Sequence, residues 1–377
     1  MKRFKQTIGG VILLVFVVAC VVFVLPKVGR RKTTGKAESN SAIILTMWHI
    51  EGVEGGVGSR CDWLSKRARE FEKRNKGVYL DVIKLTKTQL EDRLAQGQSF
   101  DLISFGPGVG ENVLPRLAAV DGSISADIYE NLLNSGKING KTYALPYMCG
   151  GYVLAARTRD VTSLTRYISL KQSVFDCYTT KKVGKKTVEL FSVMTAKSDY
   201  CCPLVNLALL ADGKGRDISK VCCEPTLTQY GAYEKFLSGN TATILLGTQR
   251  DYWRLKGRMD NGTIGGICFA ALSDYTDLVQ YVGIGKLKDR TRKELSESFA
   301  EYLTSKAVQE KLSGVGMLPV IDSAIYGDEV LKELSAAIGD AKTLNVFTSH
   351  AVLGKLYEES KNVISDGEKN LLKKYLA

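Results

Sequence analysis

The chain has 377 residues, 45% of them hydrophobic and 24% charged, which is typical of a globular protein with a substantial core and excludes a disordered chain. The net charge of +12 suggests nucleic-acid binding at first, but residues 1–36 hold eight basic residues and no acidic one. Residues 37–377 carry 44 basic against 40 acidic residues, so the body offers little electrostatic reason to bind a polyanion. Beyond the first 40 residues, 337 remain, enough for two ordinary domains.

The basic N-terminus leads into an apolar segment, Ile8 to Leu25, of 18 uncharged residues, about 27 Å long if helical. Such a segment predicts a secretory signal or a membrane anchor. The sequence VVAC resembles a lipobox, at which Cys20 would be acylated, but the apolar run continues beyond that cysteine and favours an uncleaved anchor. Ordinary signal cleavage stays open as a third alternative. The basic residues that follow favour the opposite topology, yet long downstream domains translocate largely regardless of charge, so we expect the body outside the membrane.

Nine cysteines are present, and eight of them follow Cys20. They include two vicinal pairs, Cys201-Cys202 and Cys222-Cys223. Neighbouring residues on a strand point to opposite faces, so such a pair seldom binds one metal ion. We therefore expect no metal site, and buried thiols or one or two local disulfides whose pairing the sequence does not define.

Apolar runs and amphipathic runs alternate along the first half of the chain. The patterns predict strands at residues 42–48, 78–85 and 100–105, and helices at residues 59–75, 86–97 and 111–120. Thr86 and Gln89 form a capping-box pattern at the start of the second helix, and Gly97 marks its end. Alternation of this kind predicts parallel strands joined by right-handed helical crossovers.

Two glycine-rich loops follow predicted strands, at residues 52–58 and 106–110. Loops at the carboxyl ends of parallel strands are where open α/β sheets bind ligands. Neither loop continues into Gly-Lys-Ser/Thr, so neither is a P-loop. They either bring backbone N–H groups towards a polar ligand or simply make tight turns, and both interpretations stay open.

The second half of the chain contains further boundaries between elements. Asn139-Gly140 predicts a turn, and Gly150-Gly151 lies between two strand-like runs, where a chain can cross between lobes. A predicted strand ends at Gly247 and is followed by a helix, residues 299–315 predict a helix pair with a glycine-rich break, and the chain is mainly helical from Asp328.

Several of these stretches, in this order, resemble the extracellular solute-binding proteins of ABC importers, the family that includes maltose- and oligosaccharide-binding proteins. They are ILTMWH, FDLISF, NGKTYALPYMCGGYVLAAR, ATILLGTQRDYW, LVQYVGIG and FAEYLTSKAVQEKLSGVGMLPV. The resemblance implies a hinged α/β fold of the two-lobe periplasmic-binding-protein class (type II) behind an N-terminal membrane segment. Residues 1–40 would be anchor and linker, residues 41–148 plus 282–316 the first lobe, and residues 149–281 plus 317–377 the second.

The resemblance also implies where the hinge and the ligand site lie. Hinge positions would be Cys149, Gly150, Gly151, Gly283 and Gly316. Ligand-binding positions would be Trp48, His49, Glu51, Phe105, Tyr147, Tyr152, Gln249, Arg250 and Trp253. Sugar binders of the family commonly have tryptophan where this chain has Gln249, so one stacking surface for a pyranose is missing.

Other interpretations of these residues stay open. His49 is a cleft residue, a structural residue, or less simply a base or metal ligand. Glu51 and Glu54 are ligand acceptors or solvated loop charges rather than a catalytic pair. Trp253 belongs to the cleft or to the core, and Arg250 either pairs with an acid such as Asp251 or clamps a ligand.

The resulting expectation is a monomeric, non-enzymatic receptor without a cofactor, tethered to the outer face of the membrane. It would capture a sugar or oligosaccharide by lobe closure and deliver it to ABC permease subunits. The alternatives are a receptor for another polar solute, such as a glycerophosphodiester or amino-acid derivative, and a sensor ectodomain that partners a membrane kinase. A secreted hydrolase is disfavoured because no nucleophile elbow or zinc motif is found.

Overall fold

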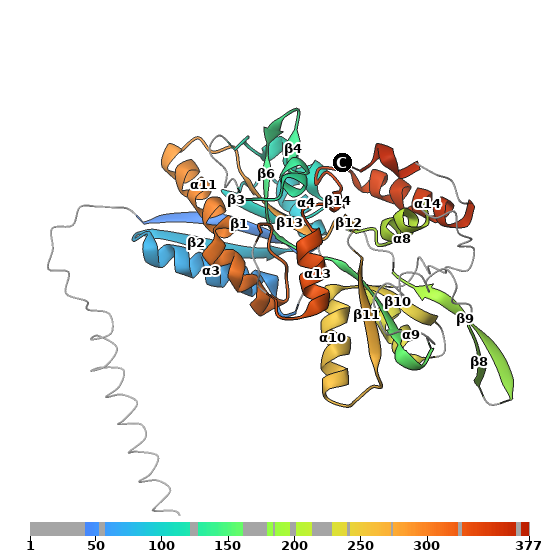
Figure 1. Ribbon diagram of the computed structural model, residues 1–377. Coiled ribbons are helices and arrows are strands. Elements are labelled where there is room, and N and C mark those ends of the chain that lie inside the picture. The colour runs from blue at the N-terminus through green and yellow to red at the C-terminus, as the bar shows by residue number, and fades with distance from the viewer. Residues whose placement is uncertain are drawn as a thin grey trace, which may run out of the picture. The chain divides into compact units, whose positions relative to one another are not determined.

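The computed structural model describes residues 42–52, 57–120, 127–160, 179–183, 185–196, 201–212, 228–239, 242–272, 274–322, 326–366 and 371–376. Its contacts divide the chain into residues 1–42 and residues 43–377, and the second unit contains the two main sheets (Figure 1). The apolar segment 8–25 and Cys20 lie outside the described residues. Within the described ranges, no helix combines the length and the apolar character needed to cross a membrane.

The first sheet has the strand order β2-β1-β3-β13-β6. Its strands are β1 (Ile43–Ile50), β2 (Val78–Leu85), β3 (Leu102–Phe105), β6 (Ala144–Cys149) and β13 (Val279–Ile284). Strand β1 is parallel to both β2 and β3, which confirms the crossover pattern expected from the alternating elements. Strand β13 is antiparallel to β3 and to β6, so the sheet is mixed.

Helices cover both faces of this sheet. They are α3 (Arg60–Arg74), α4 (Lys87–Ala95), α5 (Gly110–Val113), α6 (Glu130–Asn134), α11 (Arg290–Thr304) and α12 (Lys306–Gln309), with 3-10 turns η2 (Leu114–Arg116) and η4 (Glu310–Val315). The Thr86/Gln89 capping box forms as predicted at the start of α4. The helix expected over residues 111–120 is wrong in length, because α5 ends at Val113. Pro115, in η2, has no N–H for a further helical turn.

The second sheet has the strand order β11-β7-β10-β9-β8. Its strands are β7 (Tyr152–Arg157), β8 (Thr179–Val183), β9 (Lys186–Met194), β10 (Ala242–Thr248) and β11 (Ile267–Leu272). Strand β10 is parallel to β9 and antiparallel to β7. The strand predicted to end near Gly247, followed by a helix, is confirmed by β10 and α10 (Gln249–Asp260).

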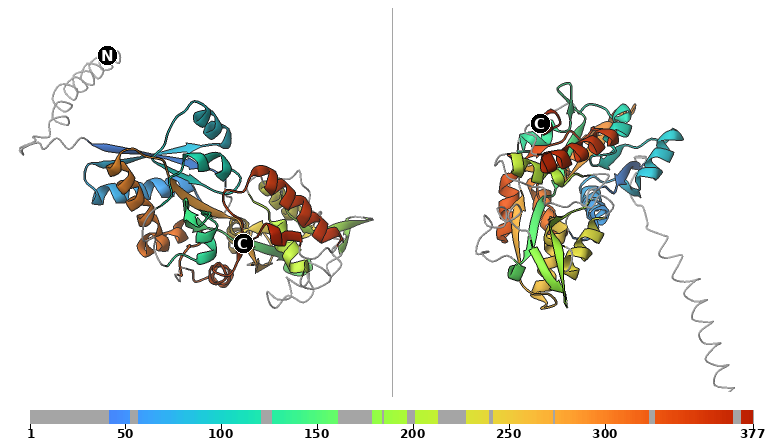
Figure 2. Two further views of the ribbon diagram at one scale, coloured as in Figure 1. Left: turned by 90° about the horizontal axis from the view of Figure 1, so that it is seen from above. Right: turned by 90° about the vertical axis from the view of Figure 1, so that its right-hand side faces the viewer.

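The other helices of the unit follow the second sheet or the C-terminal part of the chain. They are η3 (Thr158–Asp160), α8 (Leu204–Asp212), α9 (Gln229–Ser238), α13 (Glu329–Ala337), α14 (His350–Asp366) and η5 (Leu371–Lys374). Helix α14 packs against α8 (Figure 2). The mainly helical C-terminal region is therefore confirmed.

Two small sheets complete the fold. Strand β12 (Tyr275–Thr276) pairs with β14 (Lys342–Thr343), and β4 (Lys137–Ile138) pairs with β5 (Lys141–Thr142). Asn139 and Gly140, between β4 and β5, have φ of 51° and 76°. Two successive positive φ values are those of a hairpin turn, which confirms the turn predicted there.

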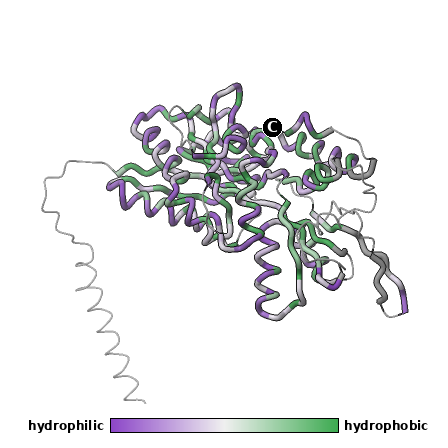
Figure 3. Tube along the Cα trace, viewed as in Figure 1, coloured by the Kyte–Doolittle hydropathy of each residue, from purple (hydrophilic) through white to green (hydrophobic). Residues whose placement is uncertain are grey.

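The inner strands of the first sheet are largely hydrophobic, whereas α3 and α10 alternate between hydrophobic and hydrophilic residues (Figure 3). On one face of the first sheet, Phe71 of α3 meets Phe299 of α11, with ring centroids 5.2 Å apart. The core on its other face continues into the second sheet, since one cluster contains Phe105, Val153 and Leu334 of α13. The two sheets are thus joined by continuous apolar packing as well as by the chain.

The loop after β3 is enclosed by the segment that precedes α14. Residues 106–110 are buried, and Phe105 lies against Phe347 with ring centroids 6.0 Å apart. A Cβ built on Gly110 would lie 2.1 Å from the carbonyl oxygen of Val346. This backbone-to-backbone approach requires glycine at position 110.

We predict that Gly110→Ala lowers the free energy of unfolding by about 1–3 kcal/mol, because the added methyl group meets backbone that cannot rotate away. The matched control is Gly257→Ala inside α10, where a Cβ would meet nothing within 4 Å. That change should stabilise the protein by up to about 1 kcal/mol through helix propensity. Denaturant unfolding measures both, and equal effects of the two substitutions would contradict the close approach.

Candidate functional site

Three segments run between the two sheets and are hydrogen-bonded side by side. The first crossing is residues 149–151, the second is residues 276–279 and the third is residues 316–320. Cys149 exchanges backbone hydrogen bonds with Leu318, at 3.0 and 2.8 Å. The N–H of Gly150 donates to the carbonyl of Leu278 at 2.6 Å, which links the first crossing to the second.

Gln249, at the start of α10, connects the first and third crossings through its carboxamide. Its Oε1 accepts from the N–H of Gly151 at 2.5 Å, and its Nε2 donates to the carbonyl of Gly316 at 2.6 Å. Its own backbone N–H donates to the carbonyl of Gly151 at 3.0 Å. The side chain is fully buried, so here the predicted ligand-binding Gln249 bonds to the crossings themselves.

Four of the predicted hinge residues lie in these crossings: Cys149, Gly150, Gly151 and Gly316. Gly283 instead lies within β13, between β3 and β6. A Cβ there would lie 2.8 Å from the side chain of Leu117, so packing within the first lobe is sufficient reason for that glycine. Strand β13 joins the first sheet from Val279, three residues before the boundary expected at residue 282.

A narrow pocket opens at the carboxyl ends of the parallel strands β9 and β10. Its volume is about 10 Å³, room for roughly one water molecule. The polar side chains that line it are those of Tyr152, Thr195, Gln229, Thr248 and Asp251. Tyr152 is among the ligand positions predicted from the sequence, and the other four are not. The signal that points to them is their position at strand ends or at the start of the following helices.

Tyr152 belongs to a buried polar cluster beside the second crossing. Its hydroxyl donates to the carboxylate of Asp277 at 2.5 Å, and the hydroxyl of Tyr275 donates to the other oxygen at 2.9 Å. The N–H of Cys202 donates to the carboxylate at 2.6 Å. Burial raises the pKa of Asp277, while these three hydrogen bonds lower it. The Tyr152 hydroxyl is therefore committed to Asp277, and the ring contributes to the pocket.

A second polar cluster is buried in the first lobe, around Ser104 of β3. Its hydroxyl lies 2.9 Å from Nδ1 of His49 and 2.8 Å from the hydroxyl of Tyr147, and Nε2 of Gln280 donates to it at 2.8 Å. The pKa of His49 is lowered to about 3, first by burial and then by the positive charges of Arg60 and Lys84. The imidazole is neutral at physiological pH and is a poor base. Its hydrogen bond with Ser104 links β1 to β3.

The remaining predicted ligand residues differ in exposure. Trp48 is buried against Phe100, with ring centroids 5.0 Å apart, and Phe105 and Tyr147 are fully buried. Glu51 is exposed and pairs with Lys84 at 2.7 Å. Arg250 and Trp253 are partly exposed, and a Cβ on Gly316 would lie 2.6 Å from Nε1 of Trp253. Glu54 lies outside the described residues. A ligand role for each remains a prediction.

Five of the cysteines lie in the described part of the chain. Cys61, Cys149, Cys202 and Cys268 are free thiols. No group of three or more His, Cys, Asp or Glu side chains in the described ranges could hold a metal ion. Burial raises the pKa of the Cys149 thiol well above its usual value, so this crossing residue is not a reactive thiolate.

We predict that Gln249→Ala lowers the free energy of unfolding by about 2–4 kcal/mol, because it leaves the Gly151 N–H and the Gly316 carbonyl buried without this partner. Gln96→Ala, an exposed glutamine at the end of α4, serves as control and should change stability by less than about 0.5 kcal/mol. Urea unfolding distinguishes them. If Gln249→Ala is as mild as the control, the carboxamide does not connect the crossings.

The low pKa of His49 predicts a fall in stability on acidification. The His49 imidazole takes up a proton near pH 6.5 in the unfolded chain but only near pH 3 in the folded protein. Its contribution to the free energy of unfolding is therefore complete above pH 6.5 and is lost as the pH falls. Between pH 7 and pH 5 the loss should be about 2 kcal/mol. His49→Gln should remove this slope, whereas the control His350→Gln, at an exposed position of α14, should keep it. Identical slopes in both variants would show that His49 is not held neutral.

Comparison with known proteins supplies the fold class. No protein-family model and no curated protein sequence matches this chain. Among solved structures, the GacH receptor of Streptomyces glaucescens GLA.O is 14% identical with a TM-score of 0.60, over 87% of this chain and 94% of that one. The sugar-binding protein MalE from Xanthomonas citri is 16% identical with a TM-score of 0.60, over 86% and 93%. A cyclo/maltodextrin-binding protein complexed with maltotetraose is 17% identical with a TM-score of 0.58, over 89% and 94%. At these identities the likeness shows the fold, a mixed α/β protein of the two-lobe periplasmic-binding-protein class.

Proposed function

We propose that this chain is the substrate-binding component of an ABC importer, which captures a sugar or oligosaccharide between its lobes and delivers it to the permease. The observation that carries the proposal is the set of three adjacent crossings bridged by Gln249. Adjacent short connections concentrate any relative movement of the lobes in one narrow region, as hinged closure requires. The function consists of binding and movement and includes no covalent step.

The second lobe supports this proposal with a polar strand-end site. The Tyr152 ring and the polar groups of Gln229 and Asp251 suit a sugar, which offers C–H faces to aromatic rings and hydroxyls to planar polar groups. The pocket holds only about 10 Å³ and is lined by second-lobe residues alone, so we propose that it marks the second-lobe side of a larger ligand site. We infer that Arg250, Trp253 and Glu51, which are at least partly exposed, contact the ligand from the rim.

We further propose that the lobes are residues 41–148 plus 279–316 and residues 149–278 plus 317–377. The start of β13 supports this shift of the boundary from 282 to 279. The body would act as a monomer outside the cell membrane, tethered through the apolar segment 8–25 or an acylated Cys20, where it meets the permease subunits.

We predict that Gln229→Ala weakens binding of the responding sugar at least ten-fold, because its carboxamide lines the pocket. Tyr230→Ala is the control, since Tyr230 is 58% exposed and the next residue of α9. Titration calorimetry with maltose, maltotriose, maltotetraose and a cyclodextrin measures both variants against the unchanged chain.

Small-angle scattering on the same samples tests closure, since the bound form should be more compact than the free form. If no sugar of the panel binds, the sugar assignment fails. If a sugar binds without compaction, lobe closure is wrong. If a sugar binds equally to both variants, the pocket assignment is wrong.

A further inference from the structure

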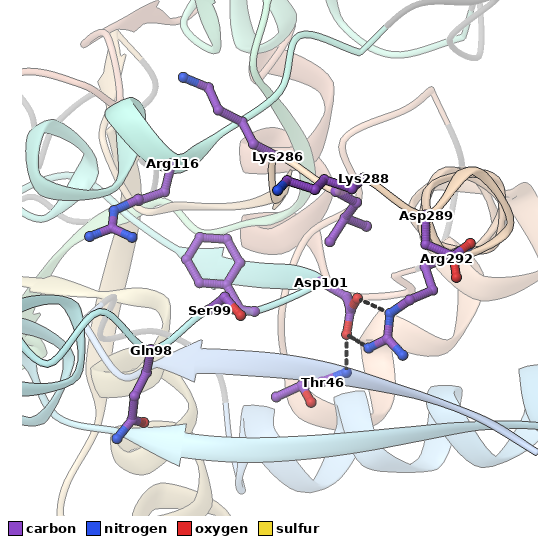
Figure 4. A pocket seen from close by; sticks show the side chains of 11 residues that line it. Thr46, Gln98, Ser99, Asp101, Arg116, Lys286, Lys288, Asp289 and Arg292 are labelled. Carbon is purple, nitrogen blue, oxygen red and sulfur yellow. Dashed lines mark hydrogen bonds and ion pairs between the residues drawn. The ribbon is translucent and has the colours of Figure 1, made fainter.

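A larger pocket lies in the first lobe, away from the crossings. Its volume is about 650 Å³, within the range of sites that hold small molecules. It is lined by Thr46 of β1, by residues 98–101 before β3, by Arg116, and by residues 286–289 and Arg292 at the start of α11 (Figure 4). Asp101 precedes β3, whereas the crossings and the proposed sugar site lie at carboxyl strand ends. The basic pocket and the second crossing therefore lie towards opposite ends of β3.

The two carboxylates of this pocket are already engaged by the protein. Asp101 is buried and receives two hydrogen bonds from Arg292, Nε to Oδ1 at 2.8 Å and Nη2 to Oδ2 at 2.6 Å. The N–H of Thr46 donates to the same carboxylate at 2.7 Å. Asp289 caps α11 by accepting from the N–H of Arg292 at 3.1 Å. Both carboxylates are thus bonded within the protein, and Asp101 neutralises the charge of the Arg292 guanidinium.

Three further cations line the pocket without an acidic partner in the described part of the chain: Arg116, Lys286 and Lys288. All three are exposed, and in Figure 4 they lie above Gln98 and Thr46. Among the described residues, their only side-chain hydrogen bond is the one that Arg116 donates to the carbonyl of Leu94, at 3.3 Å. With four cations and two acids, the lining has a net charge of +2.

The backbone holds these cations around one space. The N–H of Lys286 donates to the carbonyl of Arg116 at 2.9 Å, and the N–H of Gly285 donates to the carbonyl of Asp101 at 2.9 Å. A Cβ on Gly285 would lie 2.3 Å from the carbonyl oxygen of Phe100, so glycine permits this approach. The backbones of Arg116 and Lys286 are therefore held together by the fold, and the repulsion between the like charges that line this pocket is relieved when an anion lies between them.

We propose that this pocket is a binding site for a phosphate-bearing anion, held by Arg116, Lys286 and Lys288. The guanidinium presents paired donors to phosphate oxygens and the two ammonium groups supply point charges. The Gln98 and Ser99 side chains and the partly buried Leu287 leave room for the rest of the molecule.

Two sources share this chemistry, a soluble phosphate ester and the head group of an anionic phospholipid. Ile43, the first residue of β1, lies three residues before Thr46 of the pocket. The experiment separates the two sources.

The test uses the full chain in an uncharged detergent, with thermal unfolding followed as inorganic phosphate is added. The unchanged chain should show a saturable rise in melting temperature that shrinks with added NaCl. The triple variant Arg116→Gln, Lys286→Gln, Lys288→Gln should bind phosphate at least ten-fold more weakly. The control triple Lys76→Gln, Lys141→Gln, Lys342→Gln removes the same charge from exposed sites elsewhere and should bind within two-fold of the unchanged chain.

A second arm replaces phosphate with glycerol phosphate or with small amounts of phosphatidylglycerol, and phosphatidylcholine is the uncharged comparison. Pocket-dependent stabilisation by glycerol phosphate alone identifies a soluble ester, and stabilisation by phosphatidylglycerol as well identifies a lipid head group. The proposal is overturned if phosphate gives no saturable response, or if the pocket triple responds like the control triple. Sugar binding should be the same in both triples, so the outcome is separate from that of the proposed importer function.

Discussion

The fold depends on one planar amide placed where two chain crossings meet. Gln249 offers an acceptor to the N–H of Gly151 and a donor to the carbonyl of Gly316 at the same time. Glycine makes this approach possible, because a Cβ on Gly150 would lie 2.9 Å from Oε1 of Gln249, and one on Gly151 would lie 2.8 Å from Leu334. A tryptophan at position 249 would stack on a ligand but could not satisfy both backbone groups. The side chain that departs from the sugar-binder pattern is thus the one that bonds the crossings to each other.

Two buried clusters attach the second crossing to the lobes on either side of it. Asp277 receives the hydroxyls of Tyr152 and Tyr275 from the second lobe, whereas Gln280 donates to Ser104 in the first. Both attachments are buried, so breaking either one would leave polar groups without partners at a substantial cost. Leu278 and Val279 lie between the two attachments, and both pair with the first crossing, Leu278 with Gly150 and Val279 with Cys149.

Local sequence signals predicted the elements well, whereas the burial of single side chains depends on contacts far along the chain. The parallel strands β1 to β3, the Thr86/Gln89 capping box and the Asn139-Gly140 turn follow from spacing and from backbone preference, which are properties of neighbouring residues. The length of α5 was missed because Pro115 outweighed the apolar pattern around it. The burial of Trp48 and Phe105 depends on Phe100 and Phe347, and the latter lies more than two hundred residues further along the chain. No periodicity records such long-range contacts. The strand-end polar residues around Thr195 and Gln229 are not among the predicted ligand positions for the same reason.

The basic pocket and the second crossing lie towards opposite ends of β3. The four residues of this strand span about 13 Å, with Asp101 and the basic pocket before the strand and Phe105 as its last residue. The pocket is built on the Asp101–Arg292 pair and on backbone bonds within the first lobe, none of which involves a crossing. The crossings are bonded to Gln249, Asp277 and Gln280 and have no contact with the basic residues. The proposed anion site and the proposed lobe movement therefore depend on separate sets of bonds, so each can be tested without disturbing the other.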